Sequence, residues 1–169
     1  MVDTFATRIS AATKKEEEDA ALLEQKYRCV VTPFGQGQLT DEARNYLRQH
    51  PKPLYIRWLP DRLVIRPALY LEMMDEWMWL IDSKIGRQDT LYWVLEKAAH
   101  TAHRLQRDAL GLPIVYIWPD GCTCSYVEDL PDEKLIDGPQ RGNGSGTPYW
   151  LVPKELTRPL DDIFGKGVA

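Results

Sequence analysis

The sequence predicts an α+β fold in which small antiparallel β-hairpins pack with three to four helices. Short runs rich in Val, Ile, Tyr and Trp occur in two pairs, at residues 54–65 and 114–127, and a turn that contains Pro and Asp separates the members of each pair. Elsewhere, apolar residues recur with the period of an amphipathic helix. A chain of 169 residues, 44% of them hydrophobic, is long enough to bury a core of this kind.

Composition and charge narrow the class of protein further. The net charge is −4, from 21 Lys and Arg against 25 Asp and Glu, so the chain as a whole is not a basic nucleic-acid-binding protein. It contains no run of ~18 apolar residues that would span a membrane, and its first residues lack the pattern of a signal peptide. The three cysteines, an odd number, are typical of free thiols in a reducing compartment, so we expect a cytoplasmic protein.

Three regions differ in composition along the chain. Residues 1–27 are polar and contain a run of charged residues, so we expect a mobile N-terminal arm or helix. Residues 28–130 hold most of the predicted strands and helices and form an α+β globular domain. Within residues 131–169, the Gly-rich segment 138–146 predicts a linker that leads into a C-terminal tail.

The first half of the globular domain is predicted from β-forming runs and helix caps. Residues 27–32 are rich in β-formers, which favours a strand. Thr40 is a good N-cap for a helix that must end near His50, because prolines follow. The runs 54–58 and 63–65 then form the first hairpin.

A helix is predicted over residues 68–82, starting directly after Pro67. Its apolar residues cover more than one face, since Trp77, Met78 and Trp79 stand in a row. Core packing would explain this row. We predict instead that these three side chains bind a partner protein or a second copy of the chain, because Trp and Met are favoured in interface cores.

The second half contains a long helix and the clearer of the two hairpins. Residues 91–109 predict a helix that Gly and Pro terminate. Its apolar stripe consists of Leu91, Val94, Leu95, Ala98, Ala102 and Leu105. Strands at 114–118 and 122–127 flank a Pro-Asp-Gly turn, and residues 149–152 are expected to add an edge strand.

Histidine and cysteine residues of the second half are of the types that bind zinc. His100 and His103 are three apart on the predicted helix, and Cys122 and Cys124 are two apart on a predicted strand. Whether these four side chains converge stays open. The Cys-x-Cys spacing differs from the Cys-x-x-Cys of common zinc sites, so we expect reduced thiols, no metal and no cofactor.

A local excess of basic residues suggests phosphate binding. Residues 40–70 contain six basic and three acidic side chains, a local charge of +3, with Tyr55 and Trp58 among them. Such a patch either contacts nucleic acid or is an ordinary solvated face. We predict DNA contacts by Arg44, Arg48, Arg57, Arg62 and Arg66.

The same region resembles the Phd/YefM antitoxins. The resemblance covers about residues 39–82. It lies in the opening helix Leu-Thr-Asp-Glu-Ala-Arg-Asn-Tyr-Leu at 39–47, the hairpin segments 53–57 and 62–65, and the Tyr-Leu-Glu-Met-Met segment at 70–74. It implies a module that dimerises and binds operator DNA, with a C-terminal segment that blocks a toxin. Arg44 and Arg48 are the residues that it would place toward DNA.

These observations support three functional hypotheses. The first is a non-enzymatic regulator or inhibitor that acts by protein–protein interaction, with an antitoxin-like DNA-binding autorepressor as its specific form. The second is a phage- or plasmid-type inhibitor that binds a host complex without contacting DNA. The third is an enzyme that uses the Cys122/Cys124 hairpin; the common catalytic and nucleotide-binding motifs are absent, so we expect no enzyme.

Overall fold

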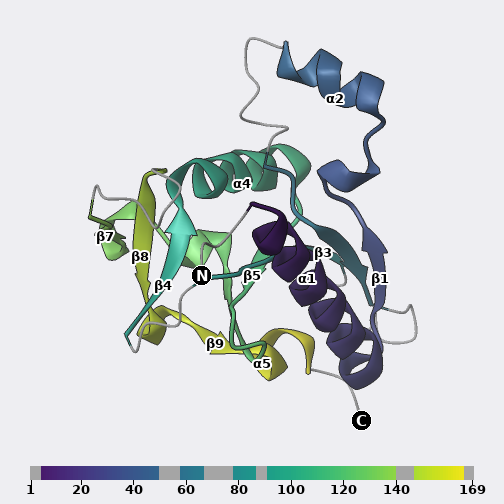
Figure 1. Cartoon of the computed structure of the whole chain (residues 1–169). Coiled ribbons are helices and arrows are strands. Elements are labelled where there is room, and N and C mark those ends of the chain that lie inside the picture. Colours follow the sequence, from purple (N-terminus) through teal and green to yellow (C-terminus); the bar gives the residue numbers. More distant parts are fainter. Residues whose placement is uncertain (1–4, 50–57, 67–77, 87–90, 140–146, 166–169) are drawn as a thin grey trace.

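The computed structural model describes residues 5–49, 58–66, 78–86, 91–139 and 147–165. It confirms the predicted α+β class, because two mostly antiparallel sheets pack with helices (Figure 1). The larger sheet has the strand order β1-β2-β3-β5-β6-β9, and the smaller sheet has the order β4-β8-β7. No helix in these ranges is long and apolar enough to cross a membrane.

The bounds of the elements are as follows. The helices are α1 (Phe5–Tyr27), α2 (Asp41–Arg48), α4 (Lys97–Leu110) and α5 (Leu160–Phe164). The strands of the larger sheet are β1 (Val30–Pro33), β2 (Arg62–Ile65), β3 (Met78–Ser83), β5 (Ile114–Ile117), β6 (Thr123–Tyr126) and β9 (Arg158–Pro159). The strands of the smaller sheet are β4 (Tyr92–Glu96), β7 (Ile136–Asp137) and β8 (Tyr149–Pro153).

The centre of the larger sheet combines antiparallel and parallel pairs. β2 pairs antiparallel with both β1 and β3, and β3 pairs parallel with β5. The connection from β3 to β5 contains β4 and α4, as the crossover between parallel strands requires. β5 and β6 form an antiparallel pair, which confirms the hairpin predicted at 114–127.

Apolar side chains fill both faces of the larger sheet. On one face, α1 and α5 cover Trp79, Ile81 and Ile117 of the central strands. On the other face, Leu80, Tyr116 and their neighbours pack against the smaller sheet. Figure 1 shows α1 lying across the first face, whereas α2 stands apart from both sheets. Residues of β3 and β5 therefore alternate between two cores.

Two predicted helices are wrong in part. Residues 78–83 form β3, where a helix over 68–82 was predicted; residues 68–77 lie outside the described ranges. A short apolar run without clear periodicity fits a strand buried on both faces as well as it fits a helix. The helix predicted over 91–109 begins only at Lys97 in α4, because residues 92–96 form β4 and alternate between half-buried and buried positions.

Smaller differences occur at element boundaries. Helix α1 continues to Tyr27, and Arg28, with a φ of 55°, ends it before β1 begins at Val30. β8 is the central strand of its sheet rather than an edge strand. Of the first predicted hairpin, residues 54–57 lie outside the described ranges. The predicted division into arm, domain and tail stays a prediction.

Candidate active site

Two aspartates meet where β2 begins and β3 ends. Asp61 directly precedes β2, and the antiparallel register places Arg62 opposite Ile81 of β3. The backbone N–H of Asp61 donates to the carbonyl of Ile81 at 2.7 Å, and the N–H of Ser83 donates to Asp61 Oδ2 at 2.8 Å. Pairing of the two strands therefore holds the Asp61 carboxylate beside Asp82.

Asp82 is paired with a lysine from the same strand end. Lys84 directly follows β3 and is two residues after Asp82, and its Nζ lies 2.9 Å from Asp82 Oδ2. Both side chains are nearly buried, with exposed fractions of 13% for Lys84 and 14% for Asp82. The Lys84 ammonium also lies over the Tyr116 ring, 4.5 Å from its centroid. Lys84 is thus held in place by a carboxylate and an aromatic ring.

Helix α1 adds a third carboxylate to this cluster. Glu16 Oε2 lies 3.6 Å from the Arg62 guanidinium, and both side chains are largely buried. Burial raises the pKa of Glu16; Arg62 lowers it and Asp82 raises it further. On the same helix, Lys15, which directly precedes Glu16, forms a nearly buried ion pair with Asp19. We refer to Glu16, Asp61, Asp82 and Lys84 as the acidic cluster.

The electrostatics of the cluster favour a bound cation. The pKa of Asp61 is raised to about 8, first by burial and then by the carboxylates of Asp82 and Glu16, while the Ser83 N–H and Lys84 oppose the shift. Carboxylates that are crowded and desolvated in this way are costly to keep ionised without additional positive charge. A divalent cation would supply that charge.

The carboxylates of the acidic cluster suit Mg²⁺ or Mn²⁺, with protein atoms filling only part of the coordination shell of the cation. Carboxylate oxygens are the ligands that these hard cations prefer. Among the described residues, no group of three or more His, Cys, Asp or Glu side chains could hold a metal ion by itself. Mg²⁺ usually binds through only one or two carboxylates and completes its shell with water and substrate phosphate. Asp61 and Asp82 are the two carboxylates of this cluster suited to that role.

Helix α4 places buried polar side chains behind the cluster. His103 Nε2 lies 3.1 Å from Asp82 Oδ2, and the Nδ1 atoms of His103 and His100 lie 3.0 and 3.1 Å from the Tyr116 hydroxyl oxygen. Burial lowers the pKa of His103 to about 4, although Asp82 opposes this shift. One turn further along α4, the Gln106 side-chain amide donates to the carbonyl of Trp58 at 2.9 Å. Trp58 is three residues before Asp61 in the sequence.

A stability prediction follows from the raised pKa of Asp61. Between about pH 4 and pH 8 the native state holds a proton at Asp61 that the unfolded chain releases, so the free energy of unfolding falls as the pH rises through this range. Asp61→Asn keeps an acceptor for the Ser83 N–H and removes the charge. In metal-free buffer at pH 8.5 we expect its Tm to exceed that of the wild type by roughly 2–4 °C or more, the shift that ~1 kcal/mol produces at this size.

Thermal unfolding followed by circular dichroism in EDTA, at pH 4.5 and pH 8.5, checks this expectation. The gain in Tm should shrink toward pH 4.5, where the wild-type carboxyl is protonated. Equal melting temperatures of wild type and Asp61→Asn at both pH values would show that the pKa of Asp61 is not raised in the folded protein.

Of the five arginines predicted to contact DNA, the structure describes the side chains of two, Arg62 and Arg66. Arg44 and Arg48 are on α2, and Arg57 lies outside the described residues. Arg62 pairs with Glu16 at the edge of the acidic cluster. Arg66 is buried: it donates to the carbonyls of Ile163 and Phe164, and its guanidinium lies 4.9 Å from the centroid of the Trp79 ring. These two side chains lie in different surroundings, and DNA contact by the five arginines stays a prediction.

The other candidate residues are also separated. Trp79 is 1% exposed and packs in the chain's own core, Met78 is half-buried, and Trp77 lies outside the described ranges. Partner binding at these positions stays a prediction.

The histidines and the buried cysteine likewise do not converge. His100 and His103 contact Tyr116 on one face of the larger sheet, whereas Cys124 packs in the core on the opposite face, where its thiol lies near the Arg158 and Pro159 carbonyls. Cys122 is exposed.

Sequence reasoning missed the acidic cluster altogether. The sequence predicts Asp61 in the turn of the first hairpin and Asp82 at the end of the helix over 68–82, and neither position by itself indicates a site. A usable signal was present: one Asp stands directly before a β-forming run, and an Asp-x-Lys triplet ends the next apolar run. Adjacent antiparallel strands bring two such positions together, which is what β2 and β3 do.

Comparison with known proteins adds a fold relationship. No protein-family model matches the chain, and a search of the curated proteins finds no match either. Among solved structures, the chain is similar to Hjc from Archaeoglobus fulgidus, a Holliday junction resolvase of an archaeal hyperthermophile. The likeness covers 94% of this chain and 99% of that chain, with a TM-score of 0.52 and 10% sequence identity. At this identity the likeness shows a shared fold.

This likeness corrects the earlier hypotheses. The resemblance to the Phd/YefM antitoxins is wrong, because nearly the whole chain follows the fold of a resolvase rather than that of a short antitoxin module. The expectations of a non-enzymatic regulator or inhibitor, and of a chain that is no enzyme, are overturned by the same finding, since the protein that shares this fold is a DNA-processing enzyme. Neither the antitoxin nor the inhibitor hypothesis is retained.

Proposed function

We propose that the protein is a metal-dependent nuclease that hydrolyses phosphodiester bonds of DNA. The observation that carries this proposal is the acidic cluster, in which Asp61, Asp82 and Lys84 come together at the adjoining ends of β2 and β3. The fold shared with a Holliday junction resolvase supports DNA as the substrate class. The cluster supports the type of chemistry independently of that likeness.

The side chains of the cluster have distinct roles in this proposal. Asp61 and Asp82 hold a divalent cation, which when bound polarises a phosphoryl oxygen and lowers the pKa of a water ligand. Lys84 places a fixed ammonium beside Asp82, where it stabilises the negative charge that develops on the phosphate in the transition state. Glu16 adds negative charge from α1 and strengthens the attraction for the cation.

The arrangement also limits what the site can accept. Lys84 and Asp82 are nearly buried, yet each side chain keeps some exposure, so a phosphate group can reach them from solvent. The chain as a whole is acidic, which disfavours tight non-specific binding to DNA. Contacts by Arg44 and Arg48 of α2 with the DNA backbone stay a prediction within this proposal.

Two earlier predictions become part of the same proposal. A homodimer would present two clusters to one DNA molecule. A cytoplasmic location agrees with the three free cysteines of the chain, Cys29, Cys122 and Cys124. A toxin or host protein as partner is not proposed.

A cleavage assay on a panel of DNA substrates tests the proposal. Purified wild type is incubated with labelled linear duplex, single-stranded, flapped and four-way-junction DNA, in Mg²⁺, Mn²⁺, Ca²⁺ or EDTA. We expect cleavage of at least one substrate in Mg²⁺ or Mn²⁺ and none in EDTA. Intact DNA on every substrate with both metals would contradict the proposal.

A further inference from the structure

The turn that follows β1 is attached to the backbone of Asp61. β1 ends at Pro33, which pairs with Arg62 of β2, and the chain then leaves the sheet and leads toward α2 (Figure 1). The N–H of Phe34 donates to the Asp61 carbonyl at 2.9 Å, and the N–H of Gly35 donates to the same oxygen at 3.2 Å. Two consecutive N–H groups of this turn therefore converge on one carbonyl oxygen.

These two bonds give Asp61 a second anchor, on the side of β2 that faces away from β3. On the side of β3, its own N–H donates to the Ile81 carbonyl at 2.7 Å, and its carboxylate accepts from the Ser83 N–H at 2.8 Å. An aspartate carboxylate is only one methylene away from the backbone. The position of this carboxylate therefore follows the position of the backbone that both anchors hold.

Gly35 approaches this backbone more closely than a larger residue could. A Cβ atom at Gly35 would lie 3.2 Å from the Pro60 carbonyl oxygen and 3.4 Å from the Asp61 Cα. Both atoms belong to the main chain, which cannot rotate away as a flexible side chain can. An alanine at this position would therefore displace the backbone at 60–61 by a few tenths of an ångström.

The turn itself is held firmly in place. The side chain of Phe34 is half-buried and packs against the core that contains Leu80 and Tyr116. The N–H of Gln38 donates to the Gly35 carbonyl at 3.0 Å and closes the turn on itself. Because the core and this hydrogen bond fix the turn, strain from an added Cβ would be passed on to Asp61.

We propose that Gly35 is a positioning residue: it allows the turn after β1 to hold the backbone of Asp61 and thereby places the Asp61 carboxylate for a divalent cation. The inference rests on the proposed function in one respect, that Asp61 holds the cation. Residues of a functional site must be held to within about 0.5 Å of the productive geometry, so a displacement of a few tenths of an ångström matters. The role requires no contact of Gly35 with the cation or with DNA.

Calorimetric titration of the DNA-free full chain with Mn²⁺ tests this inference by comparing Gly35→Ala with Gly37→Ala. Gly37 is two residues further along the same turn, where a Cβ atom would meet no described atom within 4 Å. Neither glycine has a positive φ, so both substitutions affect the unfolded chain alike and differ in the contact. We expect Gly35→Ala to weaken Mn²⁺ binding by about tenfold, and Gly37→Ala to stay within about twofold of the wild type.

A double-mutant cycle separates positioning of Asp61 from a general loss of structure. Gly35→Ala is also made in an Asp61→Asn background, and Mn²⁺ is titrated to millimolar concentrations so that weaker binding through Asp82 is measured. If Gly35 acts through the Asp61 carboxylate, Gly35→Ala causes no further loss of affinity once that carboxylate is absent. An equal loss in both backgrounds would overturn the inference.

Phe34→Ala provides a second variant if Gly35→Ala impairs folding, as checked by circular dichroism. It loosens the turn by removing its contact with the core, and it keeps both N–H groups. We expect it to weaken Mn²⁺ binding by about three- to tenfold, and only when Asp61 is present. Wild-type affinity in both Gly35→Ala and Phe34→Ala would contradict the positioning role.

The outcomes for this inference and for the proposed function are distinguishable. A protein that loses Mn²⁺ affinity through Gly35→Ala but cleaves no DNA supports the positioning role and contradicts the nuclease proposal. A wild type that cleaves DNA while Gly35→Ala binds Mn²⁺ as tightly as Gly37→Ala does the reverse. A wild type that binds no Mn²⁺ would contradict both.

Discussion

Asp82→Asn is expected to slow DNA cleavage by at least about 10³-fold, the largest loss of activity for any single change in the chain. The substitution removes the carboxylate that contacts Lys84 and His103 and that stands beside Asp61. Losing a cation-holding carboxylate removes several kcal/mol of transition-state stabilisation, and each 1.36 kcal/mol is a factor of ten in rate. Single-turnover cleavage in Mn²⁺ measures the effect.

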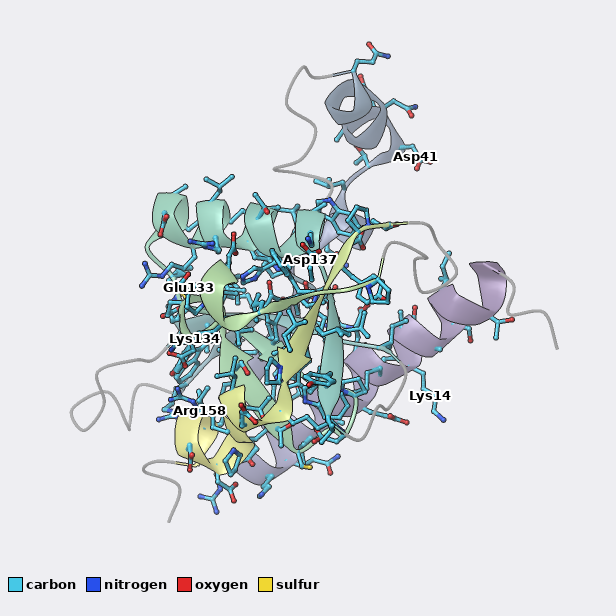
Figure 2. The ribbon with its side chains drawn as sticks, turned by 90° about the vertical axis from the view of Figure 1, so that its left-hand side faces the viewer. Lys14, Asp41, Glu133, Lys134, Asp137 and Arg158 are labelled. Atoms are coloured by element: carbon cyan, nitrogen blue, oxygen red, sulfur yellow. The ribbon has the colours of Figure 1, made fainter. Side chains whose placement is uncertain are left out.

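Asp137→Asn is the matched control for this experiment. Asp137 lies on β7 of the smaller sheet, where it pairs with Lys97 at the surface (Figure 2). Its rate should stay within about twofold of the wild type. A rate for Asp82→Asn close to that of Asp137→Asn would show that the acidic cluster does not perform the reaction.

The lysine of the cluster offers a second matched pair. Lys84→Met keeps the length of the side chain and removes the ammonium, and we expect a loss of about 10²–10³-fold, typical of removing one electrostatic stabiliser of a transition state. Lys14→Met is the control, because Lys14 is 77% exposed and points away from the body of the molecule on α1 (Figure 2).

Trp79→Ala is expected to reduce the free energy of unfolding by about 3–5 kcal/mol, the largest effect on stability. Trp79 is buried beneath α1 and α5, where its ring meets Phe164 edge-on at a centroid distance of 5.2 Å. Removing so large a side chain from a packed core leaves a cavity, because the surroundings relax only in part. Urea unfolding followed by circular dichroism measures the loss.

Trp150→Ala serves as the control for Trp79→Ala. Trp150 is only partly buried on β8, and Lys97 covers its ring, so its loss should cost about 1 kcal/mol or less. If Trp79→Ala instead left stability unchanged and reduced the mass of the particle in light scattering, the prediction of a partner-binding surface at Trp79 would be supported.

The elements that the sequence predicts well are those with local signals. The β5–β6 hairpin has a Pro-Asp-Gly turn between two β-forming runs, and Thr40 caps α2 by accepting from the Ala43 N–H. Met78–Ser83 has no such signal, since a short apolar run without clear period fits a strand or a buried helix. Because of this ambiguity, a helix was predicted where the structure has β3, one of the two central strands of the larger sheet.

The site was harder to predict than the fold because no local pattern contains it. Asp61, Asp82 and Glu16 come from three separate parts of the chain, and only the packing of α1 and the pairing of β2 with β3 bring them together. In the sequence each looks like an ordinary solvated carboxylate. His100 and His103 were noted as a pair, but their partner, Tyr116, sits in what looked like a purely structural strand.

Incorporation of ¹⁸O from water into the cleaved phosphate tests the central claim most directly. Wild type and Asp82→Asn, purified in parallel, are incubated with one DNA substrate and Mg²⁺ in H₂¹⁸O, and the products are analysed by mass spectrometry. Hydrolysis at the acidic cluster predicts one ¹⁸O atom at each new phosphate end with the wild type and essentially no cleaved product with Asp82→Asn. Intact DNA with the wild type, or equal labelling by both proteins, would contradict it.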